Sequence, residues 1–418
     1  MDFGRIEEFN EWWFTERVSK DLLKEKKRKL FFELKRFSKK RQIVSVTGLR
    51  RTGKTTLLYQ IIDFLLEEGV DNNNILYFSF DERVEKLDEV LDSYRENKGI
   101  DFRKQKVFVF LDEIQKLDEW TDQIKKMYDL YPKIKFFLSG SEGIFLSSKT
   151  KETLAGRIFE LVLKPLSFRE FIYFKGFDES ELPQIKKKQL FLEFLKKGGF
   201  IEVLNMNEKD AKLYIISAVV DKIVFQDLTK ISGIRDIDLM KTIVELAAVN
   251  PGMYLDYQSL AKQLDKDRRT IKQYITLLEQ SFLIKIMKNY RKSSISTLRK
   301  IKRIYPVDTA LINAYKLVQD EGFFGRVVET AVINSSSSVF FWKNSYEVDL
   351  VTDCPVEVKF KNKIISRDFA GIKACMKKFS FKKAIILTKD TEEQHKLKEG
   401  IVSLIPVWKF LLEETSEN

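Results

Sequence analysis

Residues 48–55 have the sequence GLRRTGKT, which matches the phosphate-binding loop pattern G-x-x-x-x-G-K-[ST]. An apolar run of strand length (42–46) precedes the loop, and a helical pattern (55–66) follows it. Glycines in this context let backbone N–H groups curl around a phosphate at the start of a helix. The stretch predicts an α/β fold that binds ATP or GTP.

Each residue type in the loop has a chemical role. We expect Gly48 and Gly53 to allow the close backbone curl, and the ammonium of Lys54 to contact the β and γ phosphates. The hydroxyl of Thr55 is the expected loop ligand of Mg²⁺. Four further residues of the stretch are predicted nucleotide contacts: Arg50, Arg51, Thr52 and Thr56.

Acidic and hydroxyl side chains follow two later strand-like runs. Asp112 and Glu113 end the run 106–111, where Asp112 is expected to hold Mg²⁺ and Glu113 to orient the attacking water. Ser139 and Ser141 follow the run 134–138; either hydroxyl suits a γ-phosphate sensor, and turn chemistry explains them as well. Arg157 is a candidate catalytic arginine finger, with a surface ion pair as the equal alternative.

The apolar runs alternate with helical segments, which indicates a parallel, doubly wound sheet. We expect the strand before the loop and the strand before Asp112 to be neighbours, so that both ends form one crevice. Ligands of such sheets bind outside the carboxyl ends of the strands.

A length of 418 residues favours several compact units. Breakers and changes of pattern suggest five segments. They are an N-terminal helical adaptor (1–40), a P-loop ATPase core (41–165), a helical lid (166–235), a winged helix-turn-helix (236–304) and a C-terminal mixed α/β domain (305–418).

Short motifs occur along the chain in a fixed order. They are GLRRTGKT, FLDE (110–113), FLSGS (137–141), LAGR (154–157), PLSF (165–168) and GGF (198–200). This order resembles the AAA+-like P-loop ATPases of the STAND group in archaea and bacteria. It resembles most the branch with a winged helix and a C-terminal restriction-endonuclease-like domain, and the resemblance covers nearly the whole chain.

The resemblance implies adenine nucleotide, Mg²⁺ and a switch-type or oligomeric ATPase. It gives the family roles to five matching residues: Lys54, Thr55, Asp112, Glu113 and Arg157. This chain departs from many relatives at Ile201, where they have a proline that packs near the base.

Positive charge is concentrated in one part of the chain. The formal net charge is +12, and residues 261–304 contain 13 Lys or Arg against three Asp or Glu. Such a stripe on a helix-turn-helix suits the phosphate backbone of DNA, although winged helices also serve as packing modules. The candidate DNA contacts are Arg268, Arg269, Lys272 and Gln273 on the recognition helix, and Arg291 and Lys292 in the wing.

Four residues near the C-terminus form an E…D-x₇-E-x-K pattern: Glu329, Asp349, Glu357 and Lys359. The spacing resembles the PD-(D/E)-x-K nuclease core, in which two acids bind Mg²⁺ and the lysine positions or activates water. The alternative is a solvated strand face, because charges at period two normally mark the exposed side of a sheet.

Two cysteines and one histidine are too few for a disulfide framework or a Cys/His zinc cluster, and no apolar run is long enough to cross a membrane. These features favour a cytoplasmic protein. The leading hypothesis is a magnesium-dependent ATPase that couples nucleotide state to DNA binding, with DNA processing as an added option. The alternative is an ATP switch or scaffold with protein partners or a second copy, and with an inactive nuclease-like domain.

Overall fold

The computed structural model describes residues 2–140, 152–228, 236–291, 301–316 and 320–413. The chain divides into two compact units, Met1–Lys164 and Pro165–Asn418. Among the described residues, no helix combines the length and the apolar character needed to cross a membrane.

Unit 1 is built on a five-stranded sheet in which every strand pairs in parallel, so the predicted α/β fold with a parallel sheet is confirmed. The strand order is β2-β3-β4-β1-β5. Their bounds are β1 (Ile43–Thr47), β2 (Ile75–Ser79), β3 (Val107–Asp112), β4 (Ile134–Gly140) and β5 (Ile158–Val162). The first four are buried along their whole length, which explains their continuous apolar sequence.

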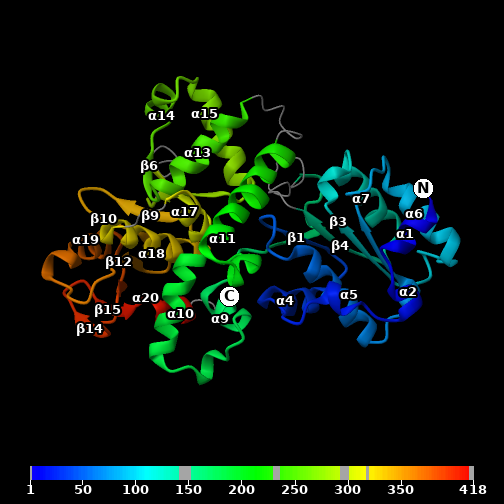
Figure 1. Cartoon of the computed structure of the whole chain (residues 1–418), viewed down its shortest axis with the longest axis horizontal. Helices are drawn as coiled ribbons and strands as arrows, with labels where there is room; N and C mark the ends of the chain where they lie inside the picture. The colour runs from blue at the N-terminus through cyan, green and yellow to red at the C-terminus, as the bar shows by residue number, and fades with distance from the viewer. Residues whose placement is uncertain (1, 141–151, 229–235, 292–300, 317–319, 414–418) are drawn as a thin grey trace. The chain divides into compact units, whose positions relative to one another are not determined.

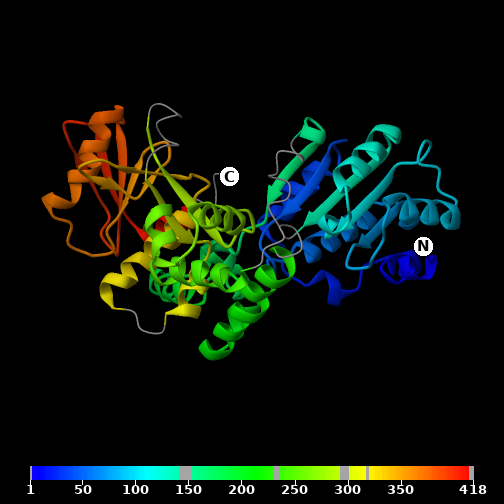
Figure 2. The same ribbon diagram turned by 90° about the horizontal axis from the view of Figure 1, so that it is seen from above.

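Helices cover both faces of this sheet (Figures 1 and 2). Helix α5 follows β1, and α3 and α4 pack against it. Helices α6 and α7 connect the next strands and pack against each other. The bounds are α3 (Lys20–Leu23), α4 (Lys29–Phe37), α5 (Lys54–Glu67), α6 (Leu87–Lys98) and α7 (Trp120–Leu130).

The expectation that the loop strand and the Asp112 strand are neighbours was wrong. Strand β4 lies between β1 and β3 and pairs with both. The sequence pattern of a buried strand contains no information on sheet order, and the inserted strand brings Ser139 to the centre of the crevice.

The segment before the sheet covers an edge strand. Helices α1 (Phe3–Glu8) and α2 (Trp12–Thr15) flank Asn10, whose amide bonds both the N–H and the C=O of Tyr77 in β2, at 2.7 and 2.8 Å. The indole N–H groups of Trp12 and Trp13 donate to the carbonyl of Ile75. These contacts satisfy backbone groups that an edge strand otherwise leaves unpaired.

Unit 2 begins with a helical region. Helix α17 (Thr309–Tyr315) packs against α10, α11 and α13 of this region. The elements are α9 (Phe168–Phe174), α10 (Gln184–Lys197), α11 (Glu208–Tyr214), the π-helical η6 (Ile215–Asp221) and η7 (Ile223–Leu228), and α13 (Ile237–Val249).

The Gly198-Gly199 pair is held by a buried carboxylate. The N–H of Gly199 lies 3.0 and 3.2 Å from the two carboxylate oxygens of Asp308. A Cβ on Gly198, where φ is +74°, would lie 2.0 Å from Asp308. Gly198 is therefore required for this close approach, and Gly199 is required for another, because a Cβ there would lie 2.6 Å from the carbonyl oxygen of Leu166.

The first sheet of unit 2 has the order β10-β9-β7-β8-β6. Two helices precede its hairpin: α14 (Tyr257–Gln263) and α15 (Arg268–Gln280). The strands are β6 (Met253–Leu255), β7 (Ile284–Asn289), β8 (Lys302–Pro306), β9 (Phe340–Lys343) and β10 (Glu347–Val348). The sheet thus joins strands from both sides of the boundary expected between residues 304 and 305.

The second sheet of unit 2 is mixed, with the order β11-β12-β13-β15-β14. Its strands are β11 (Leu350–Val351), β12 (Pro355–Val358), β13 (Lys383–Thr388), β14 (Glu393–Lys396) and β15 (Ile401–Pro406). Helices α18 (Glu321–Ser335) and α19 (Ala370–Phe379) both contact β12, and α20 (Val407–Glu413) contacts β15 and α18.

The alternating sequence of residues 347–351 predicts one strand, and this prediction was wrong. Its two halves, β10 and β11, belong to different sheets, and Asp349 lies at the crossing between them. Period-two alternation predicts extended backbone but does not reveal that the chain changes sheet within it.

Candidate nucleotide site and carboxylate pocket

Two glycines shape the loop that follows β1. Gly48 has φ +144°, and a Cβ there would lie 2.2 Å from the carbonyl oxygen of Leu163. Gly53 has φ +94° and is the N-cap of α5. Only glycine fits the first position sterically, and both positions leave the backbone bare at the start of the helix.

The predicted phosphate-binding lysine is buried within this loop. Lys54 is 6% exposed, and its Nζ donates to the carbonyls of Gly48 and Leu49, each at 3.0 Å. The hydroxyl of Thr52 donates to the same carbonyl of Leu49 at 2.8 Å. The ammonium group therefore lies at the concave side of the loop, where the sequence places a phosphate.

Asp112 is the centre of a hydrogen-bond cluster at the end of β3. It is 3% exposed and accepts hydrogen bonds from the hydroxyls of Thr55 at 2.6 Å, Tyr77 at 2.9 Å, and Ser139. The N–H of Glu113 also donates to it, at 3.0 Å. The structure thus brings together three predicted residues, Thr55, Asp112 and Ser139.

Glu113 has an unusual backbone for a side chain of its type. Its φ is +52°, in the left-handed region, and Gln115 donates to its carboxylate. Burial raises the pKa of Glu113, the charges of Lys54 and Arg50 oppose this rise, and Asp112 adds to it. A carboxylate with a raised pKa beside a lysine and a second carboxylate is the setting of a general base.

The remaining predicted contacts vary in exposure. Arg51 and Thr55 are exposed, Arg50 and Thr56 are half-buried, and Thr52 is buried. Ser141 lies outside the described residues.

Arg157 is not brought near the loop within this chain. It precedes β5, so it lies at the amino ends of the parallel strands, whereas the loop leaves the carboxyl end of β1. Its guanidinium forms a two-point ion pair with Asp129 of α7, at 3.0 and 3.2 Å.

Sequence reasoning missed two residues of this site. Tyr77 donates to Asp112 from β2. Arg28, at the start of α4, donates to the carbonyls of Thr52 at 3.0 Å and Lys164 at 2.8 Å. Both contacts join residues distant in sequence, so no local pattern predicts them.

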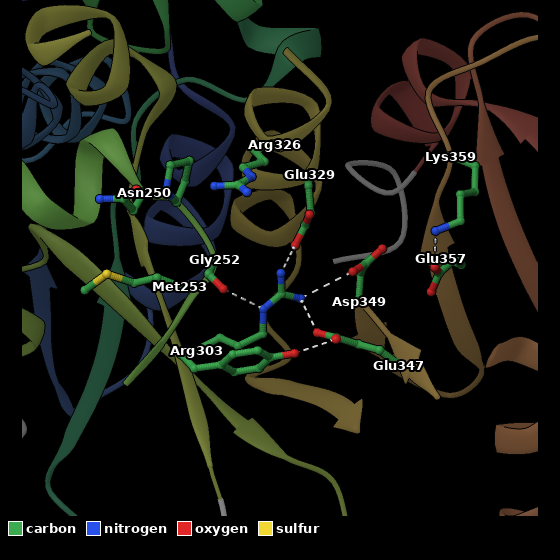
Figure 3. A pocket seen from close by; sticks show the side chains of 12 residues that line it. Asn250, Gly252, Met253, Arg303, Arg326, Glu329, Glu347, Asp349, Glu357 and Lys359 are labelled. Atoms are coloured by element: carbon green, nitrogen blue, oxygen red, sulfur yellow. Dashed lines mark hydrogen bonds and ion pairs between the residues drawn. The ribbon is translucent and has the colours of Figure 1, made fainter. Parts of the chain in front are cut away.

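A second candidate site is a pocket of about 530 Å³ in unit 2 (Figure 3). It contains all four predicted nuclease residues: Glu329, Asp349, Glu357 and Lys359. Strand β8 and the turn before β6 contribute Arg303, Gly252 and their neighbours, and β10 contributes Glu347. The E…D-x₇-E-x-K residues are therefore close in space.

Arg303 lies in the middle of the carboxylates and is 8% exposed (Figure 3). Its two terminal nitrogens lie 2.7 Å from Glu329, 3.2 Å from Glu347 and 3.3 Å from Asp349. Its Nε donates to the carbonyl of Gly252 at 2.9 Å. The sequence analysis counted Arg303 as part of the basic segment and missed its position here.

The other end of the pocket holds an ion pair. Lys359 donates to Oε1 of Glu357 at 2.5 Å, while the Oε2 atom of the same carboxylate is buried and has no hydrogen-bond partner in the described part of the chain. Burial raises the pKa of Glu357 well above its usual value, and the charge of Asp349 adds to this rise. Burial lowers the pKa of Lys359, but Glu357 and Asp349 outweigh it, so the net shift is upward.

The pocket does not form a ready metal centre. Among the residues that the structure describes, no group of three or more His, Cys, Asp or Glu side chains is arranged to hold a metal ion. Asp349 instead accepts from Arg303 and, at 3.0 Å, from the N–H of Val358.

The basic residues of α15 form an exposed face. Arg268, Arg269, Lys272 and Gln273 are exposed, while Ile271, Ile275 and Leu278, at helical spacing, form the buried side of the helix. A hollow of about 280 Å³ lies along this face, lined by Arg269, Lys272, Gln273, Thr276 and Leu277.

The two residues predicted to lie in a wing differ from those of α15. Arg291 is half-buried and donates to the carbonyl of Lys343 at 2.8 Å, so it is turned toward β9. Lys292 lies outside the described residues.

Sequence comparison links both units to known families. Residues 40–172 match the family described as AAA domain, and residues 188–321 match a domain of unknown function (DUF8612). The first match includes the loop, Asp112 and the whole parallel sheet. It supports an AAA-type P-loop domain in this part of the chain.

Two relatives are uncharacterized proteins. One, from Haemophilus influenzae, is 28% identical over 273 residues, which cover 64% of this chain and 67% of the relative. Another, from Methanocaldococcus jannaschii, is 26% identical over 408 residues, covering 89% and 88%.

Solved structures give only distant similarity. Caenorhabditis elegans PCH-2 is 13% identical with a TM-score of 0.31; the match covers 51% of this chain and 63% of PCH-2, which is under two thirds of its length. Cdc6p from Pyrobaculum aerophilum is 10% identical with a TM-score of 0.32, covering 76% of this chain and 98% of Cdc6p.

Proposed function

We propose that the chain binds ATP with Mg²⁺ at the loop of unit 1 and hydrolyses it. The observation that supports this most is the 2.6 Å contact between Thr55 and Asp112 beside the buried ammonium of Lys54. A hydroxyl and a carboxylate are oxygen ligands of the kind that Mg²⁺ takes, and the loop leaves a glycine backbone for the phosphates. The residues present therefore fit a magnesium nucleotide.

The chain's own groups have separate roles in this proposal. Lys54 binds the β and γ phosphates, and Thr55 with Asp112 holds the ion, which when bound neutralises phosphate charge. Glu113 orients the attacking water and accepts its proton. Ser139 and Tyr77 fix the orientation of Asp112. Arg157, distant from the loop of its own chain, acts as a finger only from a second copy of the chain.

ATP turnover tests this function. Lys54→Ala removes the phosphate contact, and Glu113→Gln removes the proton acceptor but keeps the shape of the side chain. We expect Glu113→Gln to bind ATP and to lose turnover by roughly 10²- to 10³-fold. Lys39→Ala, which removes an exposed lysine elsewhere in unit 1, is the matched control.

We further propose that α14, α15 and the β7–β8 strands are a winged helix that contacts DNA through the exposed face of α15. Burial lowers the pKa of Lys302, and the nearby charges of Lys288 and Lys272 lower it further, against Glu279. Lys288 and Lys302 are cross-strand partners in β7 and β8, and Lys272 lines the hollow on α15. Such a face suits phosphates, with little preference for base sequence.

Salt dependence tests the DNA contact. Reversing the charges of Arg268, Arg269 and Lys272 should abolish duplex binding at low salt. The matched control reverses three exposed lysines of the second sheet region: Lys389, Lys396 and Lys398. Equal binding by both triple variants, or a salt-insensitive complex with protein partners, would favour the scaffold function.

For the C-terminal sheet we propose a restriction-endonuclease-like fold that does not cleave. Arg303 favours this over metal-dependent cleavage, because its guanidinium already forms ion pairs with three acids of the pocket. A purified-protein assay with Mg²⁺ or Mn²⁺ separates the two functions. DNA cleavage that is lost in both Asp349→Ala and Lys359→Ala would establish a nuclease.

A further inference from the structure

Arg303 has the contacts of a bound cation. Its three guanidinium nitrogens all contact acceptors: Nε the carbonyl of Gly252, and the terminal pair the carboxylates of Glu329, Glu347 and Asp349. Strand β8, which holds Arg303, pairs with β6 on one side and β7 on the other. The position of this charge is therefore fixed by a sheet, not by a mobile loop.

The pocket also contains a carboxylate, that of Glu357, with which Arg303 forms no ion pair in the described structure. Glu357 is 7% exposed and lines the pocket, and none of the residues that the structure describes forms a hydrogen bond with its Oε2. A buried carboxylate oxygen of this kind costs free energy unless it is paired or bound to a cation. The Oε2 atom of Glu357 is therefore an oxygen that could bind a cation together with Asp349.

We propose that Arg303 is the resident cation of this pocket and excludes divalent metal ions from Asp349 and its neighbouring carboxylates. Removing its charge should turn the pocket into a divalent-cation site. The inference deepens the proposal of a non-cleaving domain and names the residue that determines it.

Charge balance is the physical reason. Four carboxylates line the pocket, and removing one partner of a buried ion pair leaves the other charges uncompensated. Methionine at position 303 keeps much of the length of arginine but has no charge. Carboxylate oxygens left in this way are ligands that Mn²⁺ and Mg²⁺ prefer.

Manganese binding tests the proposal. Mn²⁺ is titrated without nucleotide and followed by electron paramagnetic resonance, with every variant in an Asp112→Asn background so that the proposed Mg²⁺ ligand of unit 1 is removed. We expect Arg303→Met to gain one site, at least roughly tenfold tighter than any in the parent, and lost on adding Asp349→Asn. Arg326→Met, which removes an exposed arginine at the same pocket, is the matched control and should gain no such site.

Two results would overturn the proposal. One is an Asp349-dependent Mn²⁺ site in the parent that is as tight as in Arg303→Met; the other is a folded Arg303→Met that binds no Mn²⁺. If Arg303→Met requires metal to fold, refolding in the presence of Mn²⁺ but not of Na⁺ supports the proposal. Failure to refold with either ion, together with a folded Arg303→Gln that binds no Mn²⁺, contradicts it. Loss of ATPase activity leaves this readout unchanged, because no nucleotide is used.

Discussion

Asp112 in unit 1 and Asp349 in unit 2 are both buried carboxylates near the end of a strand, but their partners differ in charge. Asp112 accepts hydrogen bonds from three hydroxyls and a backbone N–H. Asp349 accepts from a guanidinium and a backbone N–H. Neutral donors form hydrogen bonds with a carboxylate but do not compensate its negative charge, so a cation from solution can still bind there. A fixed arginine compensates part of that charge within the fold itself.

The largest expected effect lies in the arginine-filled pocket. Arg303→Met should lower the free energy of unfolding by about 3–5 kcal/mol, because it leaves the buried Asp349 and two partly buried carboxylates without their cation. Urea denaturation, with hydrogen exchange of β8 and β10 peptides, measures the loss. Arg326→Met should change it by less than about 1 kcal/mol. Equal losses in the two variants would show that Arg303 has no special role.

In the loop of unit 1 we expect a steric effect, from adding a side-chain atom to a glycine. Gly48→Ala places a Cβ 2.2 Å from a backbone oxygen, so we expect a loss of about 1–3 kcal/mol and more than tenfold weaker binding of magnesium nucleotide. Gly69→Ala is the matched control, because Gly69 also has a positive φ, +84°, but open space around it. Similar behaviour of both variants would mean that backbone strain, and not the contact with Leu163, matters.

The neutral donors of Asp112 give an effect of about the same size. Tyr77→Phe removes one hydrogen bond to a carboxylate, which is typically worth about 1.5–3 kcal/mol. We expect the Mg²⁺ dependence of nucleotide binding to shift to higher concentration. Tyr94→Phe removes a buried hydroxyl that donates to the carbonyl of Asn73, so it should affect stability but not Mg²⁺ dependence. An unchanged Mg²⁺ dependence in Tyr77→Phe would remove Tyr77 from the site.

The smallest effect is a pH slope in the arginine-filled pocket. Burial, with the charge of Asp349, raises the pKa of Glu329 from 4.5 to about 7, although Arg303 opposes the rise. A carboxyl group with a raised folded-state pKa binds more protons when folded, so stability should fall as pH rises from about 4.5 to about 7.

Glu329→Gln should reduce this slope without abolishing it, because the pKa of Glu357 is raised in the same direction. Urea midpoints across this range measure it. Stability that increases with pH through the window, or an unchanged slope in the variant, would contradict the assigned environment of Glu329.

The sequence predicted the parts of each site that are local. The loop, Asp112 and the strand pattern follow from short motifs, because a phosphate-binding turn needs neighbouring residues of fixed types. Tyr77 was not predictable, since its contact with Asp112 depends on β2 pairing with β3. The position of β4 between β1 and β3 was not predictable for the same reason. The order of strands in a sheet is set by the crossover connections and not by the composition of the strands.

In unit 2 the same limit applies more strongly. The E…D-x₇-E-x-K spacing identified four acidic and basic residues that the fold brings into one pocket. Arg303 enters that pocket from a strand that sequence analysis assigned to the winged helix, because one sheet combines β7, β8 and β9. A spacing pattern cannot report a cation supplied by another element.

Isothermal calorimetry of the full chain with ATP and Mg²⁺ tests the central claim most directly. The account predicts one nucleotide bound per chain, and at least roughly tenfold weaker binding in Lys54→Ala, with Lys39→Ala unchanged. No uptake of magnesium nucleotide by the folded protein, or uptake that Lys54→Ala leaves undiminished, would contradict it.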